Sequence, residues 1–206
     1  MTASGGDGLA TGRLRLPGGR APGSLGLVQE LVNTSLRVPQ DSDRLADLLA
    51  DPDRAAAWLS RALEQWAGAT GQPVPELALG RADLAPLREV REAVRELAGP
   101  GQPDPAAAAA LSDLALTLGL GLDGRMSYGP AGSGWRGVAA LVAAEILLAQ
   151  QRGQWARFKS CPFERCGIAF YDSSRNASRV WHDVSTCGNQ TNLRAYRARQ
   201  KDAASS

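Results

Sequence analysis

The sequence predicts a mostly α-helical fold, and three observations support this class. Ala, Leu and Arg are abundant while aromatic residues make up only 5% of the 206 residues, which favours helices over a β-sandwich. Apolar residues recur at helical spacing in several segments that follow a capping residue. Every Cys and His residue lies within residues 157–206. We therefore expect an N-terminal helical domain with a small β-hairpin, followed by a separate C-terminal module.

Composition excludes a disordered chain and a membrane-spanning one. The 44% hydrophobic content is enough for a globular core. No apolar run approaches the roughly 20 residues that a membrane helix needs. The glycine-rich start lacks the apolar stretch of a secretory signal. We expect a soluble, cytoplasmic protein.

Glycine and proline positions suggest the domain boundaries. Residues 1–23 hold seven glycines and two prolines without periodicity, so we expect a flexible leader outside the fold. The helical domain is expected over residues 24–153, with Gly153 at its end, and the C-terminal module over residues 154–203.

Capping residues indicate where the helices begin. Ser24 is a candidate cap for a first helix that ends at Pro39, and Asp51-Pro52 supplies a cap and a first-turn proline for a second. The third helix should bury its apolar side chains from Leu84 to Leu97, while the opposite side can face water with Arg88, Glu92, Arg95 and Glu96.

The remaining helical domain is expected to continue with a hairpin and one more helix. Asp104-Pro105 repeats the cap-plus-proline start, and its apolar residues suggest a fourth helix that reaches Leu118. Asp123-Gly124 is a hairpin turn between two short strands within residues 119–137. A last apolar helix is expected from Val138 to Gln151.

The helical domain contains none of the catalytic or nucleotide-binding motifs GxGxxG, Walker, HExxH or GxSxG. Its tryptophans at positions 58, 66, 135 and 155 could line a ligand pocket, but large aromatic side chains at helical spacing more often fill a core. We favour the core, so this part of the sequence discloses no activity.

The C-terminal module carries a candidate metal site with the pattern C-x4-C-x15-H-x4-C. Zinc takes four such ligands in a tetrahedron, and four protein ligands leave no open position for a catalytic water. Merely buried thiols are the alternative, but three cysteines and the single histidine in one short window favour structural zinc. The expected ligands are Cys161, Cys166, His182 and Cys187.

Local sequence around these ligands predicts a treble-clef-like zinc finger. Gly167 suits a tight knuckle because it can adopt positive φ. Residues 168–171 have the character of a short strand, and Asp172-Ser173-Ser174 should turn the chain back. A helix from Asn189 to Lys201 follows the last ligand.

The module is also basic. Residues 1–156 hold 14 basic and 17 acidic residues, a net charge of −3, whereas residues 157–206 hold 9 and 4, a net charge of +5. Such asymmetry indicates an anionic partner. The guanidinium group of arginine can form bidentate hydrogen bonds with a phosphate group or with the base edge of guanine. A solvated helix with cations near its carbonyl end is the alternative. The candidate DNA-binding residues are Arg175, Arg179, Arg194, Arg197, Arg199 and Lys201.

The segment from Cys161 through Trp181-His182 and Cys187-Gly188-Asn189-Gln190 to Arg199 resembles the CGNR zinc finger. Leu31-Val32-Asn33-Thr34 and the helices around it resemble the ABATE domain, a type described as a stress-induced transcription regulator, which precedes that finger in bacterial proteins. The resemblance implies DNA-binding transcriptional regulation. The chain departs from the family pattern at His182, where cysteine is usual, and at Gln190, where arginine is usual. The histidine can still bind zinc, whereas the glutamine removes one phosphate contact.

Two functions remain open on these observations. A regulator would dock its finger on DNA while the helical domain senses a small-molecule effector or mediates association, for instance as a homodimer. If four of the six cations meet phosphates, log affinity should change with log salt at a slope of about −3.6. A zinc-stapled protein-interaction module is the alternative. An enzyme is not expected, because the deaminase signature is missing and the metal takes the single histidine.

Overall fold

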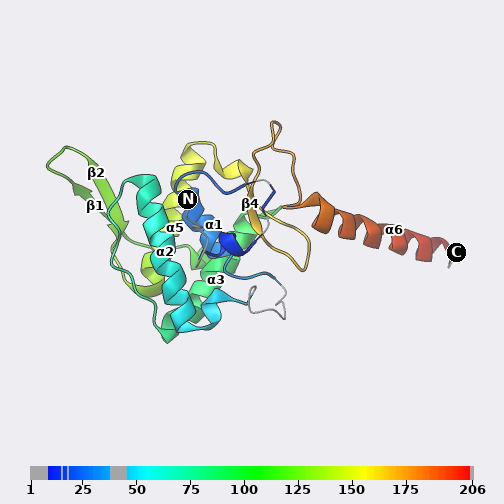
Figure 1. Cartoon of the computed structure of the whole chain (residues 1–206), viewed down its shortest axis with the longest axis horizontal. Helices are drawn as coiled ribbons and strands as arrows, with labels where there is room; N and C mark the ends of the chain where they lie inside the picture. The colour runs from blue at the N-terminus through cyan, green and yellow to red at the C-terminus, as the bar shows by residue number, and fades with distance from the viewer. Residues whose placement is uncertain (1–8, 15, 18, 38–45, 205–206) are drawn as a thin grey trace, which may run out of the picture.

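The computed structural model describes residues 9–14, 16–17, 19–37 and 46–204. Helices from the first three quarters of the chain form a bundle, a two-stranded hairpin projects from one end of it, and a small finger with a long helix extends from the other (Figure 1). The mostly helical fold with a small hairpin and a C-terminal finger is confirmed. The helices are α1 (Leu25–Val32), α2 (Pro52–Thr70), α3 (Arg81–Leu97), α4 (Pro105–Ala110), α5 (Gly134–Gln151) and α6 (Asn189–Ala204).

The short helix α1 is the centre of the bundle. All eight of its residues are buried, and α2, α3 and α5 pack around it. Trp58 and Trp66 fill the core as expected, while Trp135 and Trp155 are partly buried at its edge. Within the described residues, no helix is long and apolar enough to cross a membrane.

The predicted caps place the helix starts correctly. The Asp51 carboxylate accepts hydrogen bonds from the backbone N–H groups of Asp53 and Arg54, 3.0 Å each, and Asp104 caps α4 in the same way. Helix α1 begins directly after Ser24, although the Ser24 side chain makes no capping bond. It ends at Val32, and the expected stop at Pro39 lies outside the described residues.

The fourth helix is shorter than predicted. Helix α4 ends at Ala110, and Asp113 adopts a positive φ of 54°, which a helix cannot accommodate. Leu118, expected on this helix, lies in β1 (Leu116–Leu120), which pairs antiparallel with β2 (Met126–Pro130). The Asp123-Gly124 turn is confirmed. Helix α5 then begins at Gly134, four residues earlier than expected.

Part of the expected leader belongs to the fold. Ala10 and Thr11 are buried because the Glu30 carboxylate of α1 accepts a 2.6 Å bond from Ala10 N–H and further bonds from the N–H and hydroxyl of Thr11. A buried carboxylate needs donors, and this segment, which includes η1 (Thr11–Arg13), supplies them. Leu9, Ala10 and Thr11, which were expected in a leader outside the fold, are therefore buried against α1.

Candidate metal centre and basic helix

Two of the predicted metal ligands lie on one tight loop. Strands β3 (Phe158–Ser160) and β4 (Ala169–Tyr171) pair antiparallel, so the loop between them closes into a knuckle. Cys161 N–H donates to the Ile168 carbonyl at 2.9 Å, and Cys166 N–H donates to the Phe163 carbonyl at 2.8 Å. The short strand at residues 168–171 is confirmed, but its partner precedes the knuckle rather than following the turn at Asp172.

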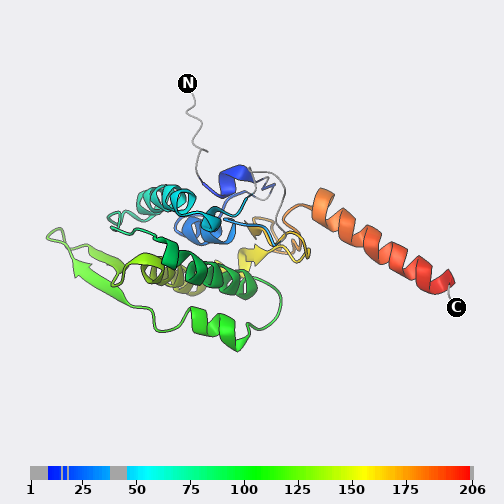
Figure 2. The same ribbon diagram turned by 90° about the horizontal axis from the view of Figure 1, so that it is seen from below.

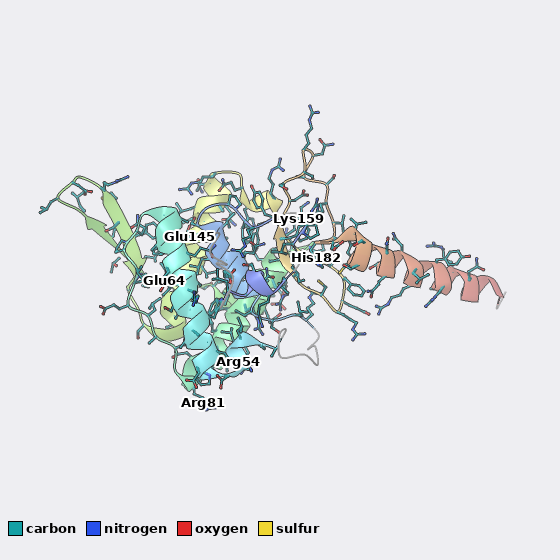
Figure 3. The ribbon with its side chains drawn as sticks, viewed as in Figure 1. Arg54, Glu64, Arg81, Glu145, Lys159 and His182 are labelled. Carbon is teal, nitrogen blue, oxygen red and sulfur yellow. The ribbon has the colours of Figure 1, made fainter. Side chains whose placement is uncertain are left out.

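The other two ligands come from the chain that leads into α6. Cys187 lies in η5 (Val184–Gly188), a single π-helical turn directly before α6. The Asp183 carboxylate caps this turn by accepting a 2.9 Å bond from Ser185 N–H. His182 lies at the base of α6, next to the knuckle (Figure 3). The start of α6 is thereby tied to the knuckle through the ligand cluster.

The four ligand atoms have the spacing of a tetrahedral zinc site. Cys161, Cys166, His182 and Cys187 are all buried, and one ligand atom from each lies within 4.8 Å of the others. His182 Nδ1 is 3.4 Å from Cys166 Sγ and 3.6 Å from Cys187 Sγ. Metal–ligand bonds of about 2.3 Å to sulfur and 2.0 Å to nitrogen place tetrahedral ligands about 3.5 Å apart. The residues therefore fit zinc, which His182 would bind through Nδ1.

The three thiols of the cluster also shift one another's pKa values. A hydrogen bond from Cys166 lowers the pKa of Cys161 to about 4, and the same bond, together with burial, raises the pKa of Cys166. Burial and the neighbouring Cys161 thiolate raise the pKa of Cys187. A divalent ion bound by these residues would supply the positive charge that favours three thiolates.

Gly167 is required by two independent features of the knuckle. Its φ is +68°, a left-handed conformation that glycine adopts without strain. A Cβ at this position would also lie 2.6 Å from Arg37 Cγ and 3.0 Å from Arg95 Cδ. The predicted positive φ is confirmed, and the crowding by two arginines from the helical body is an additional constraint.

Arg95 joins the helical body to the knuckle. Its side chain is only 2% exposed, so the expectation that it faces water is wrong. Its Nε donates to the Gly167 carbonyl at 3.0 Å, and its Nη2 donates to the carbonyls of Val32 and Ser35 at 2.7 Å each. The backbone carbonyl groups at the end of α1 and in the knuckle lack partners within their own segments. The buried guanidinium group donates the hydrogen bonds that they need.

Asn33 makes a second connection between the same two parts. Its amide Nδ2 donates to the Ala169 carbonyl at 3.0 Å, and its Oδ1 accepts from Ala169 N–H at 2.8 Å. Gln29 donates to the same carbonyl. The Asn33 side chain thus replaces a neighbouring strand along the free edge of β4, which gives the Leu31-Val32-Asn33-Thr34 motif a structural role.

An ion pair between the partly exposed Lys159 and the buried Asp172 orders the loop between β4 and His182. Lys159 Nζ donates to Asp172 Oδ2 at 2.8 Å and to the carbonyls of Ala177 and Arg179 (Figure 3). Asp172 also accepts bonds from Ser174 and from Arg179 N–H. Sequence reasoning assigned Asp172 to a turn but missed Lys159, because their pairing depends on the register of β3 and β4.

Neutralising Asp172 should destabilise the finger in a pH-dependent manner. Burial opposes ionisation of Asp172, but hydrogen bonds from Lys159, Ser174 and Arg179 lower its pKa. A lowered carboxyl pKa stabilises the fold above the unfolded value of about 3.9 and loses this effect as pH falls below it. We expect Asp172→Asn to reduce the free energy of unfolding by about 3 kcal/mol at neutral pH.

Urea titrations of the zinc-loaded protein from neutral pH to pH 3 measure this difference. It should shrink below about pH 4, where the carboxyl group of residue 172 takes up a proton in the unfolded wild-type chain while it stays ionised in the folded one. Asp53→Asn, at an exposed position on α2, is the control and should have little effect. An equal cost for Asp172→Asn at every pH would contradict the role of its charge.

The predicted cations occupy different environments. Arg175, Arg197 and Arg199 are exposed, whereas Arg179 is half-buried. Arg194 forms an ion pair with Glu164 of the knuckle and lies over the Phe163 ring at 5.2 Å, so it holds α6 against the finger. Lys201 lies in α6, but its side chain is outside the described part.

One further cation was missed by the sequence analysis. Arg165 is exposed at the tip of the knuckle, between Glu164 and Cys166. The two cysteines of this segment indicated a metal site, and no feature of the sequence distinguished the arginine between them as a candidate for binding DNA. It adds a positive charge near the base of α6.

A helical body joined through buried polar contacts to a closed Cys3His finger defines a zinc-finger protein with two parts. The model of the ABATE family, described as "Putative stress-induced transcription regulator", matches residues 25–150. The model of the CGNR zinc finger matches residues 157–200. The chain therefore belongs to the ABATE family, and it carries a CGNR-type finger after that domain. A comparison with curated proteins finds no match.

Proposed function

We propose that this protein is a DNA-binding transcriptional regulator that uses α6 and the zinc finger to contact DNA. The observation that carries this proposal is the exposure of α6, which packs against η5 and projects away from the body (Figure 2). Residues 189–201 contain four basic and no acidic residues. An isolated helix of this length is marginal in water, so a projecting basic helix is best explained by an anionic partner.

Zinc has a structural role in this proposal. The ion would be held by Cys161, Cys166, His182 and Cys187, and four protein ligands leave no position for a catalytic water. We therefore assign no enzymatic activity. The ABATE domain would sense a small-molecule effector or mediate association. Binding to DNA would place the protein in the compartment that holds the DNA, in keeping with the cytoplasmic location expected from the sequence.

Salt-dependent DNA binding tests the proposal. Contacts from Arg175, Arg197 and Arg199 alone would give a slope of log affinity against log salt of about −2.7. We expect the zinc-loaded protein to shift the anisotropy of labelled duplex DNA with at least this dependence. Binding that is undetectable or independent of salt would contradict the proposal.

A matched pair of variants separates contacts by α6 from a general effect of charge. Arg197→Glu with Arg199→Glu should abolish DNA binding while zinc content stays unchanged. Arg54→Glu with Arg61→Glu changes the net charge equally, but on the exposed face of α2, and should leave most of the affinity. Equal losses in both variants would argue against contact by α6.

The alternative is a protein-binding module. Leu193 and Tyr196 are about half exposed on α6, and their i, i+3 spacing puts them on one face of the helix. If the Arg197→Glu and Arg199→Glu variant still captures a protein partner and the wild-type chain never binds nucleic acid, this alternative replaces the first proposal.

Restoring the arginine that the family usually has at position 190 should strengthen DNA binding. Gln190 is exposed in the first turn of α6, so an arginine there is free to reach a phosphate. We expect Gln190→Arg to raise affinity and to steepen the salt slope by about 0.9. Gln190→Ala is the control and should leave the slope unchanged. An unchanged slope in Gln190→Arg would show that the first turn of α6 does not approach DNA.

A further inference from the structure

The β1–β2 hairpin carries an apolar face that the described chain does not cover. Leu116, Leu118 and Leu120 alternate along β1 and therefore share one face. The register pairs Leu120 with Met126 of β2 on that face. Leu118 and Leu120 are 74% and 70% exposed, and Leu122 at the turn and Met126 are exposed as well.

The same face packs against the bundle at one residue of β2, the partly buried Tyr128. Tyr128, the partner of Leu118 in the register, packs edge-to-face against Trp66 with ring centroids 5.8 Å apart. Its hydroxyl donates to Glu145 at 2.5 Å. The outer end of the β1–β2 hairpin extends past the body (Figures 1 and 2), and its apolar residues there face solvent.

Such a face is unfavourable in an isolated chain. A two-stranded ribbon is marginally stable in water unless its face packs against something. Contiguous exposed apolar patches of this kind mark interaction sites in soluble proteins. Each strand of this sheet also has one open edge, which can accept a further strand.

We propose that this face binds the same face of a second copy of the chain, forming a two-fold symmetric dimer. Complete coverage of Leu116, Leu118, Leu120, Leu122 and Met126 sets an upper limit of roughly 600 Å² per chain, or about 1,200 Å² for two copies. That total reaches the lower end of the range for specific interfaces. A two-fold axis brings identical surfaces together, so an apolar face can match itself.

The charges of the hairpin also favour a second copy. Within residues 116–130 the charged residues are Asp123 and Arg125, which sum to zero. Two copies therefore meet without net repulsion, and an acidic and a basic side chain are available to pair across the axis. A neutral, apolar face has no excess positive charge with which to bind DNA phosphate groups. This site is therefore distinct from the basic helix at the opposite end of the molecule (Figure 1).

Sedimentation of the zinc-loaded full chain across the micromolar range tests the proposal. We expect the wild-type chain to sediment as a dimer and Leu118→Glu with Leu120→Glu to sediment as a monomer. Both leucines are exposed in the single chain, so the substitutions should not disturb its fold. The variant should therefore keep the circular dichroism spectrum and zinc content of the wild-type chain, and it should melt at the temperature of the dissociated wild-type monomer.

Leu193→Glu is the control, because Leu193 is also exposed but lies on α6, far from the hairpin. This variant should remain a dimer. A wild-type chain that is monomeric throughout, or a dimer that survives Leu118→Glu with Leu120→Glu, would overturn the proposal. Dissociation by Leu193→Glu alone would place the interface on α6 instead.

Discussion

Removing zinc is expected to unfold the finger and to destabilise the helical body. Zinc binding contributes about 10 kcal/mol or more in small structural sites, and the second buried cluster of the described chain consists largely of the ligand thiols with Phe163, Ile168 and Phe170. Without zinc this cluster cannot offset the entropy of ordering residues 157–200. The effect should reach the body because Asn33, Gln29 and Arg95 would lose partners in β4 and the knuckle.

Hydrogen exchange with and without a chelator measures this effect. Backbone amides of β3, β4 and η5 should lose all protection, those at the end of α1 should lose part of it, and those in the middle of α2 should keep theirs. Cys161→Ser should reproduce the chelated pattern without chelator. An unchanged pattern in the finger after complete metal removal would contradict a structural role for the ion.

Replacing Arg95 should have the second largest effect. In Arg95→Met the carbonyls of Gly167, Val32 and Ser35 lose a common donor inside the protein, and the loss of a buried charged partner costs about 3–5 kcal/mol. We expect the melting temperature to fall by about 10 °C. Zinc affinity should fall as well, because the knuckle loses the bond that fixes Gly167.

Calorimetry and competition with a zinc chelator measure the two effects. Arg88→Met is the control, because Arg88 lies two turns earlier on α3 but is exposed, and it should change neither quantity appreciably. If Arg95→Met lowers stability without weakening zinc binding, the bond from Arg95 to Gly167 does not support the metal site.

Sequence was a good guide where the structure depends on neighbouring residues. Asp51 and Asp104 are followed directly by the helices they cap, so their role is visible in a few residues. Likewise, Gly167 directly follows a metal ligand and needs a positive φ. The four ligands could be chosen from sequence because all cysteines and the single histidine lie in one short segment. These local features gave the fold class and the candidate metal site.

Sequence was a poor guide where one residue acts on a distant segment. Arg95 looked like a solvent-facing residue because its buried acceptors come from the end of α1 and from the knuckle. Glu30 draws residues 10–11 into the core, although glycine content alone suggested a leader outside the fold. Both cases depend on bonds between segments at least 19 residues apart, and periodicity carries no information about such bonds.

The fourth helix illustrates a different limit. Its leucines fit both a helical stripe and the alternation of a strand, and the choice is made by pairing with β2 rather than by local preference. The same alternation produces the exposed face on which the proposed dimer rests.

X-ray absorption at the zinc edge tests the central claim most directly. Protein purified from zinc-replete cells should hold one zinc ion per chain, with three sulfur ligands at about 2.3 Å and one nitrogen ligand at about 2.0 Å. A folded finger without bound metal, or a zinc ion without a nitrogen ligand, would contradict the assignment of Cys161, Cys166, His182 and Cys187 as one closed site.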